Sequence, residues 1–222
     1  MNLEETYVWA QQLLPEPQTL DRFQVGESFP EFTVLQVELD SDETVAMTVD
    51  AGRIEAGLEA EAGTEVRVEF VTVVAEHGSL AGELVAAAAT MVSQDPVGLT
   101  PQPGTVMRGL ADHVRDDIPA RHGLLIVPFL WEAGVPQVHE VSSGGGRRAK
   151  RADQTDADGE TASGKDFDYT HPGRLTVPAQ VVLLTDEELT ILEDARAAGG
   201  NGVDELQEHL SAQNVNINDL WR

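Results

Sequence analysis

The stretch Val181–Gly200, "VVLLTDEELTILEDARAAGG", decides the fold class of this chain because it joins a strand to a helix. Its four opening apolar residues predict a buried strand. After Thr185, the spacing of Leu189, Leu192 and Ala195 is that of one buried helical stripe. A strand that runs directly into a helix is typical of folds in which helices cover a sheet.

Three acids follow Thr185, and they could be either working carboxylates or the start of a helix. Thr185 precedes Glu188 by three residues, which is the spacing of a capping box. Asp186 and Glu187 then fall in the first turn, where the helix dipole favours negative charge by about 0.3–1 kcal/mol each. We therefore predict Thr185 and Glu188 to be a structural cap and the acids not to be catalytic.

Apolar periodicity elsewhere predicts alternating strands and helices. The predicted strands are a hairpin within 31–49 and single strands over 64–76, 122–132 and 174–184; the predicted helices are 2–14, 79–93, 186–200 and 203–213. These elements predict an α+β fold, with a mixed β-sheet and helices packed on it, in a single domain over residues 1–222.

Two local patterns refine this prediction. In the strand over 64–76, Glu65, Arg67 and Glu69 share one face, which predicts that this face is exposed where the strand begins. Residues 142–170 contain a glycine run and charged residues but no large aliphatic side chain. Such a segment buries too little apolar surface to offset the entropy of ordering. We predict a flexible insertion there.

The charge of the chain excludes several partners. Among its 222 residues, 39 acids face 14 lysines and arginines, giving a net charge of −25. This charge repels nucleic acid phosphates and anionic lipids, so we expect neither nucleic acid nor a membrane as a partner. The acidity has two interpretations: a face that meets a basic protein, or adaptation of the whole host proteome.

The remaining composition is compatible with a cytoplasmic protein, which is the location we expect. The chain has no cysteine, which excludes disulfides and thiolate metal sites. No apolar run approaches the ~20 residues of a membrane span, and the first residues do not resemble a secretory signal. Only two of the 14 basic residues are lysine, a bias that indicates a GC-rich genome.

Sequence motifs supply no catalytic constellation and no cofactor site. H-E-x-x-H, P-loop and G-x-S-x-G patterns do not occur. One alternative is a metal-dependent hydrolase, because Asp112, His113, Asp116 and Asp117 lie close together in "ADHVRDD". We favour a solvated surface for these four residues and predict no metal ligand.

Trp131 is the best aromatic candidate for a contact with another protein. It follows the apolar run "HGLLIVPFL" and precedes Glu132. Core packing is one interpretation, and an interface anchor beside a charged rim is the other. Together with Asp186 and Glu187, Trp131 and Glu132 form the predicted partner-binding set.

Three stretches resemble the Suppressor-of-fused-like domain family, over about residues 30–222. The first is "VAMTVDAGRI" followed by "EVRVEFVTVVAE" and a helix. The second is "TPQPGTVMRGL" before "HGLLIVPFLWE", similar to a Pro-Gly segment that precedes an apolar strand. The third, and most specific, is "RLTVPAQVVLLTDEELTILEDARAAGGNGVDELQEHL".

This resemblance implies a fold and a class of activity. Animal members of the family bind and restrain a transcription factor, and bacterial members are often inferred to be immunity proteins that neutralise toxins. The resemblance therefore implies a non-enzymatic, protein-binding domain, and it transfers no functional residue. Adaptation of a housekeeping domain to its host remains an alternative, and the oligomeric state stays open.

Overall fold

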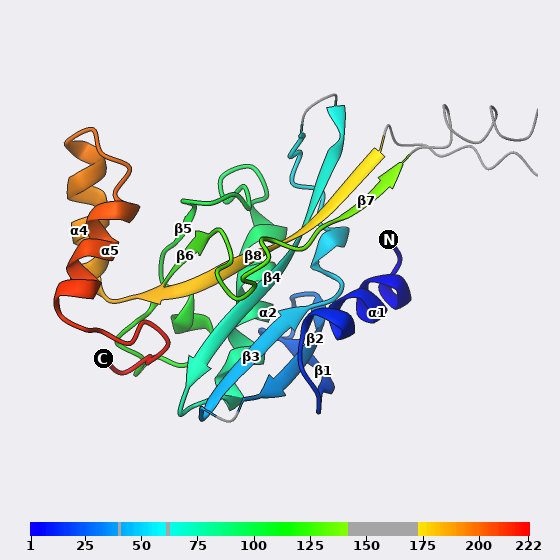
Figure 1. Cartoon of the computed structure of the whole chain (residues 1–222), viewed down its shortest axis with the longest axis horizontal. Helices are drawn as coiled ribbons and strands as arrows, with labels where there is room; N and C mark the ends of the chain where they lie inside the picture. Colours follow the sequence, from blue (N-terminus) through cyan, green and yellow to red (C-terminus); the bar gives the residue numbers. More distant parts are fainter. Residues whose placement is uncertain (40, 61–62, 142–172) are drawn as a thin grey trace, which may run out of the picture.

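One mixed eight-stranded sheet runs through the molecule, and helices lie against both of its faces (Figure 1). The computed structural model describes residues 1–39, 41–60, 63–141 and 173–222. Its strand order is β1-β2-β3-β4-β8-β6-β5, with β7 also paired to β8. The predicted α+β class, with a mixed sheet and packed helices, is confirmed.

The strands and helices alternate along the chain. The strands are β1 (Thr19–Gln24), β2 (Glu31–Glu38), β3 (Glu43–Thr48), β4 (Glu65–Ala75), β5 (Val106–Met107), β6 (His122–Ile126), β7 (Val138–Val141) and β8 (Gly173–Leu184). The α-helices are α1 (Leu3–Leu13), α2 (Ser79–Gln94), α4 (Asp186–Ala197) and α5 (Val203–Ala212), with short 3-10 turns η1 (Ala51–Arg53) and η3 (Ala111–His113). Within the described ranges, no helix is long and apolar enough to cross a membrane.

Strand β8 connects the two halves of the sheet. One edge of β8 pairs in parallel with β4, and the other edge pairs antiparallel with two different strands. β7 lies opposite residues 173–176, and β6 lies opposite residues 180–184. Pro178, which has no backbone N–H to donate, lies in the gap between these two partners.

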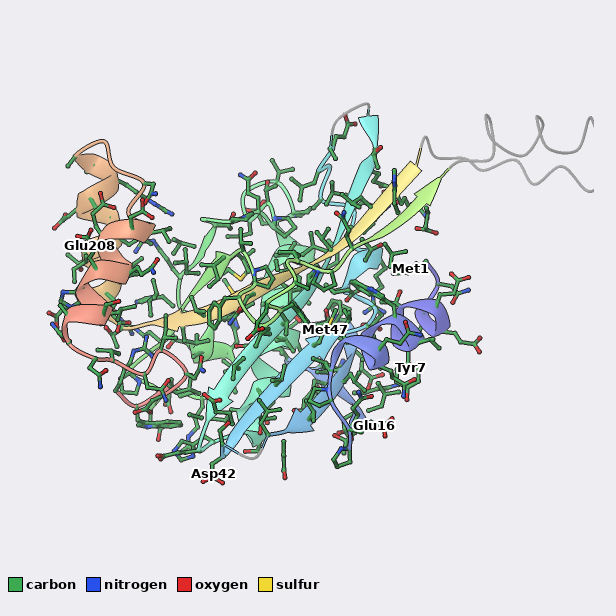
Figure 2. The ribbon with its side chains drawn as sticks, viewed as in Figure 1. Met1, Tyr7, Glu16, Asp42, Met47 and Glu208 are labelled. Atoms are coloured by element: carbon green, nitrogen blue, oxygen red, sulfur yellow. The ribbon has the colours of Figure 1, made fainter. Side chains whose placement is uncertain are left out.

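Helices α2 and α1 cover opposite faces of the sheet, with α2 behind it and α1 in front (Figure 1). The alanine-rich run of α2 is fully buried, and its small side chains let the helix pack closely on Phe32, Val34 and Phe70. On the other face, α1 packs on a cluster around Met47, with Tyr7 at its edge (Figure 2).

Helices α4 and α5 form a pair at one end of the sheet (Figure 1). Leu189, Leu192 and Leu206 pack there against β6 and β8. Gly202 makes the tight connection between the two helices, with φ of +79°. A Cβ atom at this position would lie 2.5 Å from the carbonyl oxygen of Leu192, so the turn requires glycine.

Most predicted elements are present, but three strands were missed and one strand was predicted too long. The missed strands are β1, β5 and β7. The strand predicted over 122–132 ends at Ile126, two residues before Pro128. The insertion predicted over 142–170 lies outside the described residues.

The prediction of an exposed face at the start of β4 was wrong. Arg67 and Glu69 have exposed fractions of only 7% and 1%. Both side chains lie on the face of the sheet that α1 and the turn η1 cover. The alternation along β4 was correct, but a cover formed by a distant helix leaves no mark on the strand itself.

Candidate functional site

An apolar groove lies between helix α5 and the end of strand β6. Its volume is about 980 Å³. Its apolar lining comes from β6 and the residues after it, from β8, and from α5 and the segment that follows it: Leu124, Leu125, Ile126, Val127, Phe129, Val182, Val203, Leu206, Leu210, Val215 and Ile217. In Figure 1, β8 runs from the far side of the molecule toward the end that carries α4 and α5, and the groove involves the last part of β8. We call this feature the α5 groove.

Two large apolar side chains stay exposed at the α5 groove. Val127 and Phe129 each have an exposed fraction of 57%. The backbone N–H of Phe129 donates to Oε1 of the buried Gln180, over 3.2 Å, which holds the chain against β8 after β6 ends. Exposed apolar side chains that gather at one hollow indicate a binding surface, whereas isolated exposed apolar side chains are common on protein surfaces.

The outer edge of the α5 groove is polar and acidic. Gln207 and Ser211 line both the groove and an adjacent shallow hollow, which Asp204 and Glu208 complete. Glu208 is exposed at the outer side of the helix pair (Figure 2). Arg196 is the basic side chain that lines the groove.

The arginines of the described residues are committed to contacts within the molecule. There are nine of them, and eight form salt bridges: Arg22, Arg53, Arg67, Arg108, Arg115, Arg121, Arg174 and Arg222. The ninth, Arg196, donates to the carbonyl oxygens of Gly104 and Asn201, over 3.0 and 3.1 Å.

The acids greatly outnumber these arginines. The described residues contain 31 carboxylate side chains, of which 22 have no salt bridge to another described residue. The described surface therefore presents an excess of negative charge. Such a surface attracts cationic partners and repels phosphates.

A second, polar pocket of about 380 Å³ lies between the start of α1 and strands β4 and β8. Glu69 lies at this pocket and is fully buried. Its carboxylate accepts a hydrogen bond from the Thr48 hydroxyl (2.6 Å) and from the backbone N–H groups of Ala51 and Gly52 (3.0 Å each). Burial raises the pKa of Glu69 to about 7 despite these donors.

The polar pocket has a structural explanation. Glu69 satisfies the first N–H groups of the turn η1 and so fixes this turn to β4. Arg67 and Arg174 both bind Glu65 at the other side of the pocket. Since Glu69 is hydrogen-bonded to η1 and the two arginines pair with Glu65, the arrangement indicates that the pocket holds η1 against the sheet.

The comparisons with known proteins identify the fold. No family model matches the sequence, and a search of curated proteins gives no match. A crystal structure described as a homolog of the suppressor of fused protein (SUFU), from Neisseria gonorrhoeae, superposes with a TM-score of 0.56. The match covers 99% of this chain and 93% of that chain, at 14% sequence identity.

The chain has a Suppressor-of-fused-like fold. The resemblance seen in the sequence is thus confirmed for the fold. At 14% identity the match shows the fold alone and transfers no functional residue to this chain.

Within the Suppressor-of-fused-like fold, Trp131 is held by internal contacts. It is half-buried, and its indole N–H donates to the carbonyl oxygen of Leu13 over 3.1 Å. The ring packs on the cluster beneath α1. Glu132 is exposed. A partner contact by Trp131 and Glu132 remains a prediction, and the Trp131 indole already joins the loop after β6 to α1.

The other predicted residues lie at the opposite end of β6. Thr185 and Glu188 form a capping box: the Thr185 side chain accepts from the Glu188 N–H (3.3 Å), and Glu188 accepts from the Thr185 N–H (2.8 Å). Asp186 accepts from His122 and Arg121, and these bonds lower its pKa. Glu187 is exposed. The four predicted partner-binding residues therefore do not form one compact patch.

The residues of the hydrolase alternative do not converge. Asp112, His113, Asp116 and Asp117 are all exposed near η3. Asp117 pairs with Arg115, whose hydrogen bond lowers the pKa of Asp117. Nowhere in the part of the chain that the structure describes do three or more histidines, aspartates or glutamates gather in a manner that could hold a metal ion.

Sequence reasoning missed the α5 groove. The helix predicted over 203–213 is present as α5, and the spacing of Val203, Leu206 and Leu210 places them on one face of it. Val203 and Leu210 remain partly exposed, whereas Leu206 is buried. The only signal for the groove was Pro128 in an apolar run, because a strand that stops there leaves the next apolar residues without a ladder partner.

Proposed function

We propose that this protein is a non-enzymatic binding domain whose partner is a basic protein. The observation that carries the proposal is the imbalance of charge: all nine described arginines are engaged internally, while 22 described carboxylates have no salt bridge to another described residue. Complementary charge steers association and rejects partners of like charge. A cationic protein surface fits this excess.

The Suppressor-of-fused-like fold supports a finer proposal: the chain is a bacterial immunity protein that neutralises a basic toxin. Such a protein must meet its toxin inside the producing cell, so the proposal also assigns it to the cytoplasm. On this proposal the exposed Glu132 and Glu187, together with Asp186 and Trp131, belong to the surface that surrounds the contact. Host adaptation of a housekeeping domain is the competing explanation of the acidity.

The test is to identify a partner and then reconstitute the pair. The full chain, tagged and expressed in its own cells, is purified with its bound proteins, and each recovered protein is titrated against it by calorimetry. We expect a basic partner whose affinity falls steeply as salt rises. If the neighbouring gene encodes a toxin-like protein, co-expression of the present chain with that toxin should restore the growth that the toxin suppresses.

A matched charge variant serves as the control. Glu132→Gln, Glu187→Gln and Glu208→Gln remove three exposed charges without removing side-chain volume. We expect the triple variant to bind the partner more weakly and with a smaller salt dependence. Recovery of acidic or abundant housekeeping proteins alone, captured equally by the variant, would contradict the proposal. A similar excess of acids across unrelated proteins of the same genome would favour host adaptation.

A further inference from the structure

The α5 groove has a mainly apolar lining, so attraction between opposite charges alone does not explain what it could bind. We propose that it receives large apolar side chains from a lysine- or arginine-rich segment of the partner. This inference rests on the proposed function, because it specifies how a basic partner is recognised. It adds that binding depends on apolar contact at one place, in addition to the overall attraction between charges.

The size and lining of the groove support apolar contact. Its volume of about 980 Å³ is at the upper end of the range that holds a drug-sized ligand, so it has room for several side chains. Val127 and Phe129 expose more than half of their surface on one side, and the partly exposed Val203 and Leu210 lie on the other. Burying such side chains against a partner gives the main favourable term of association.

Charge indicates what must surround those apolar side chains. Asp204 and Glu208 stand along the outer face of α5, beside Gln207 and Ser211 of the groove edge. Arg196 is the positively charged residue that lines the groove, and its guanidinium donates hydrogen bonds to two backbone carbonyls. A segment with lysines or arginines next to its apolar anchors therefore meets opposite charge at this edge.

The same charge argues against a second copy of this chain as the occupant. Two copies would bring together bodies that each carry a large negative net charge, and the repulsion opposes association. A basic segment has no such cost. The oligomeric state of the free protein is therefore an informative part of the test.

The experiment compares two synthetic peptides of equal length and equal lysine content. One places leucines between its lysines, and the other places serines at the same positions. Both are labelled, and their binding to the full chain is measured by fluorescence anisotropy at low and high salt. We expect the leucine peptide to bind at least about tenfold more tightly, and to keep part of its affinity at high salt.

Two variants locate the contact. Val127→Ser with Phe129→Ser removes the exposed apolar side chains of the groove and leaves the backbone bond to Gln180 in place. Val97→Ser is the control, because Val97 has an exposed fraction of 83% and is not part of the groove lining. We expect the groove variant to bind both peptides equally weakly, whereas Val97→Ser keeps the tenfold preference.

A measurement without substitutions protects the test from a variant that fails to fold. Titration of the isotope-labelled full chain with the leucine peptide should move the amide resonances of Val127, Phe129, Gln207 and Ser211 first. Resonance changes confined to another face would overturn the inference. The peptide experiment also distinguishes failure of this inference from failure of the proposed function. Equal binding of the two peptides would contradict only the inference about the groove. If neither peptide binds, the proposed basic partner is contradicted as well.

The remaining outcome concerns self-association. If sedimentation shows that the free chain is a dimer that Phe129→Ser dissociates, the groove is occupied by a second copy and the inference is overturned. A monomer at the same concentration, together with the leucine preference, supports it.

Discussion

His122 Nε2 lies 2.7 Å from Asp186 Oδ1, and this contact joins the start of β6 to the start of α4. The other ring nitrogen, Nδ1, accepts the backbone N–H of Gly109 over 3.0 Å. A backbone N–H can only donate, so Nδ1 carries no proton and the proton of the neutral ring lies on Nε2, facing Asp186. The imidazole thus ties the loop before η3, strand β6 and helix α4 together.

We expect Asp186→Asn to destabilise the protein at neutral pH. The hydrogen bond from His122, followed by that from Arg121, lowers the pKa of Asp186 below its ordinary value of 3.8. A carboxylate with a lowered folded-state pKa stabilises the protein above the unfolded pKa, and this contribution is lost as pH falls through the lowered value. Urea unfolding at a series of pH values should show the difference from wild type shrinking below about pH 3.8.

Glu187→Gln is the matched control, because Glu187 is an exposed acid in the same helical turn. It removes the same interaction with the helix dipole but leaves the His122 contact intact. Equal destabilisation by both substitutions would mean that the histidine contributes nothing to stability.

We expect Glu188→Ala to cost more stability than Thr185→Ala. Loss of the Thr185 cap costs about 0.5–2 kcal/mol. Glu188 also binds the guanidinium of Arg222 through two hydrogen bonds of 2.9 and 2.7 Å, and the side chains of Arg222 and Glu188 are only 9% and 7% exposed. Removing one partner of a buried ion pair costs about 3–5 kcal/mol, because the other charge stays buried.

Chemical denaturation of both variants, with Thr185→Ser as the control that keeps the cap hydroxyl, measures this difference. A double variant, Glu188→Ala with Arg222→Met, should recover part of the loss. If Glu188→Ala lowers the free energy of unfolding no more than Thr185→Ala does, the ion pair with Arg222 makes no net contribution to stability.

We expect the stability of the wild-type protein to decrease between about pH 4.5 and pH 7 because of Glu69. Burial raises the pKa of this carboxyl from 4.5 to about 7. The unfolded chain releases its proton first, so the contribution of the protonated form is complete below pH 4.5 and is lost as pH rises to about 7. The loss is on the order of 3 kcal/mol at most.

Glu69→Gln removes this titration, and the slope of stability against pH should become flatter over that interval. The absolute stability of the variant is not the readout, since an amide cannot accept all three hydrogen bonds of the carboxylate. The exposed Glu27→Gln should leave the slope as in wild type. An unchanged slope in Glu69→Gln would show that another group titrates there.

We expect Gly82→Ala to destabilise the protein, although alanine normally stabilises a helix by about 0.5–1 kcal/mol relative to glycine. A Cβ atom at Gly82 in α2 would lie 2.4 Å from Cζ of Phe23 and 2.8 Å from Oε1 of Gln36. Overpacking of this kind costs about 1–3 kcal/mol. Thermal unfolding should show a lower Tm for Gly82→Ala. In a Phe23→Ala background the same substitution should become neutral or stabilising, and a persistent loss there would exclude the ring contact as the cause.

The elements that could be predicted are those whose own residues carry the pattern. The β2–β3 hairpin and β4 alternate clearly, and α1, α2, α4 and α5 show helical spacing, so local periodicity was sufficient. Strand β1 was missed because it is an almost wholly exposed edge strand with no alternation. Strands β5 and β7 have two and four residues and form only because a longer strand lies beside them.

The site could be predicted only where it depends on local sequence. The capping-box spacing of Thr185 and Glu188 is visible in four consecutive residues. The partner of Glu188, Arg222, is 34 residues away, and the partner of Asp186, His122, is 64 residues away. The α5 groove likewise depends on where the chain after β6 passes relative to α5, which no short window contains.

The central place of β8 in the sheet affects how the chain folds during its synthesis. β4 ends at Ala75, yet the strand that it pairs with in parallel begins at Gly173 and must also receive β6. During synthesis the first four strands therefore keep one edge of β4 unpaired until residues 173–184 have left the ribosome. Contacts so distant along the chain make closure slow, and an open edge invites pairing with the wrong neighbour. We therefore expect β4 to be the part of the sheet most exposed to wrong pairing before β8 is made.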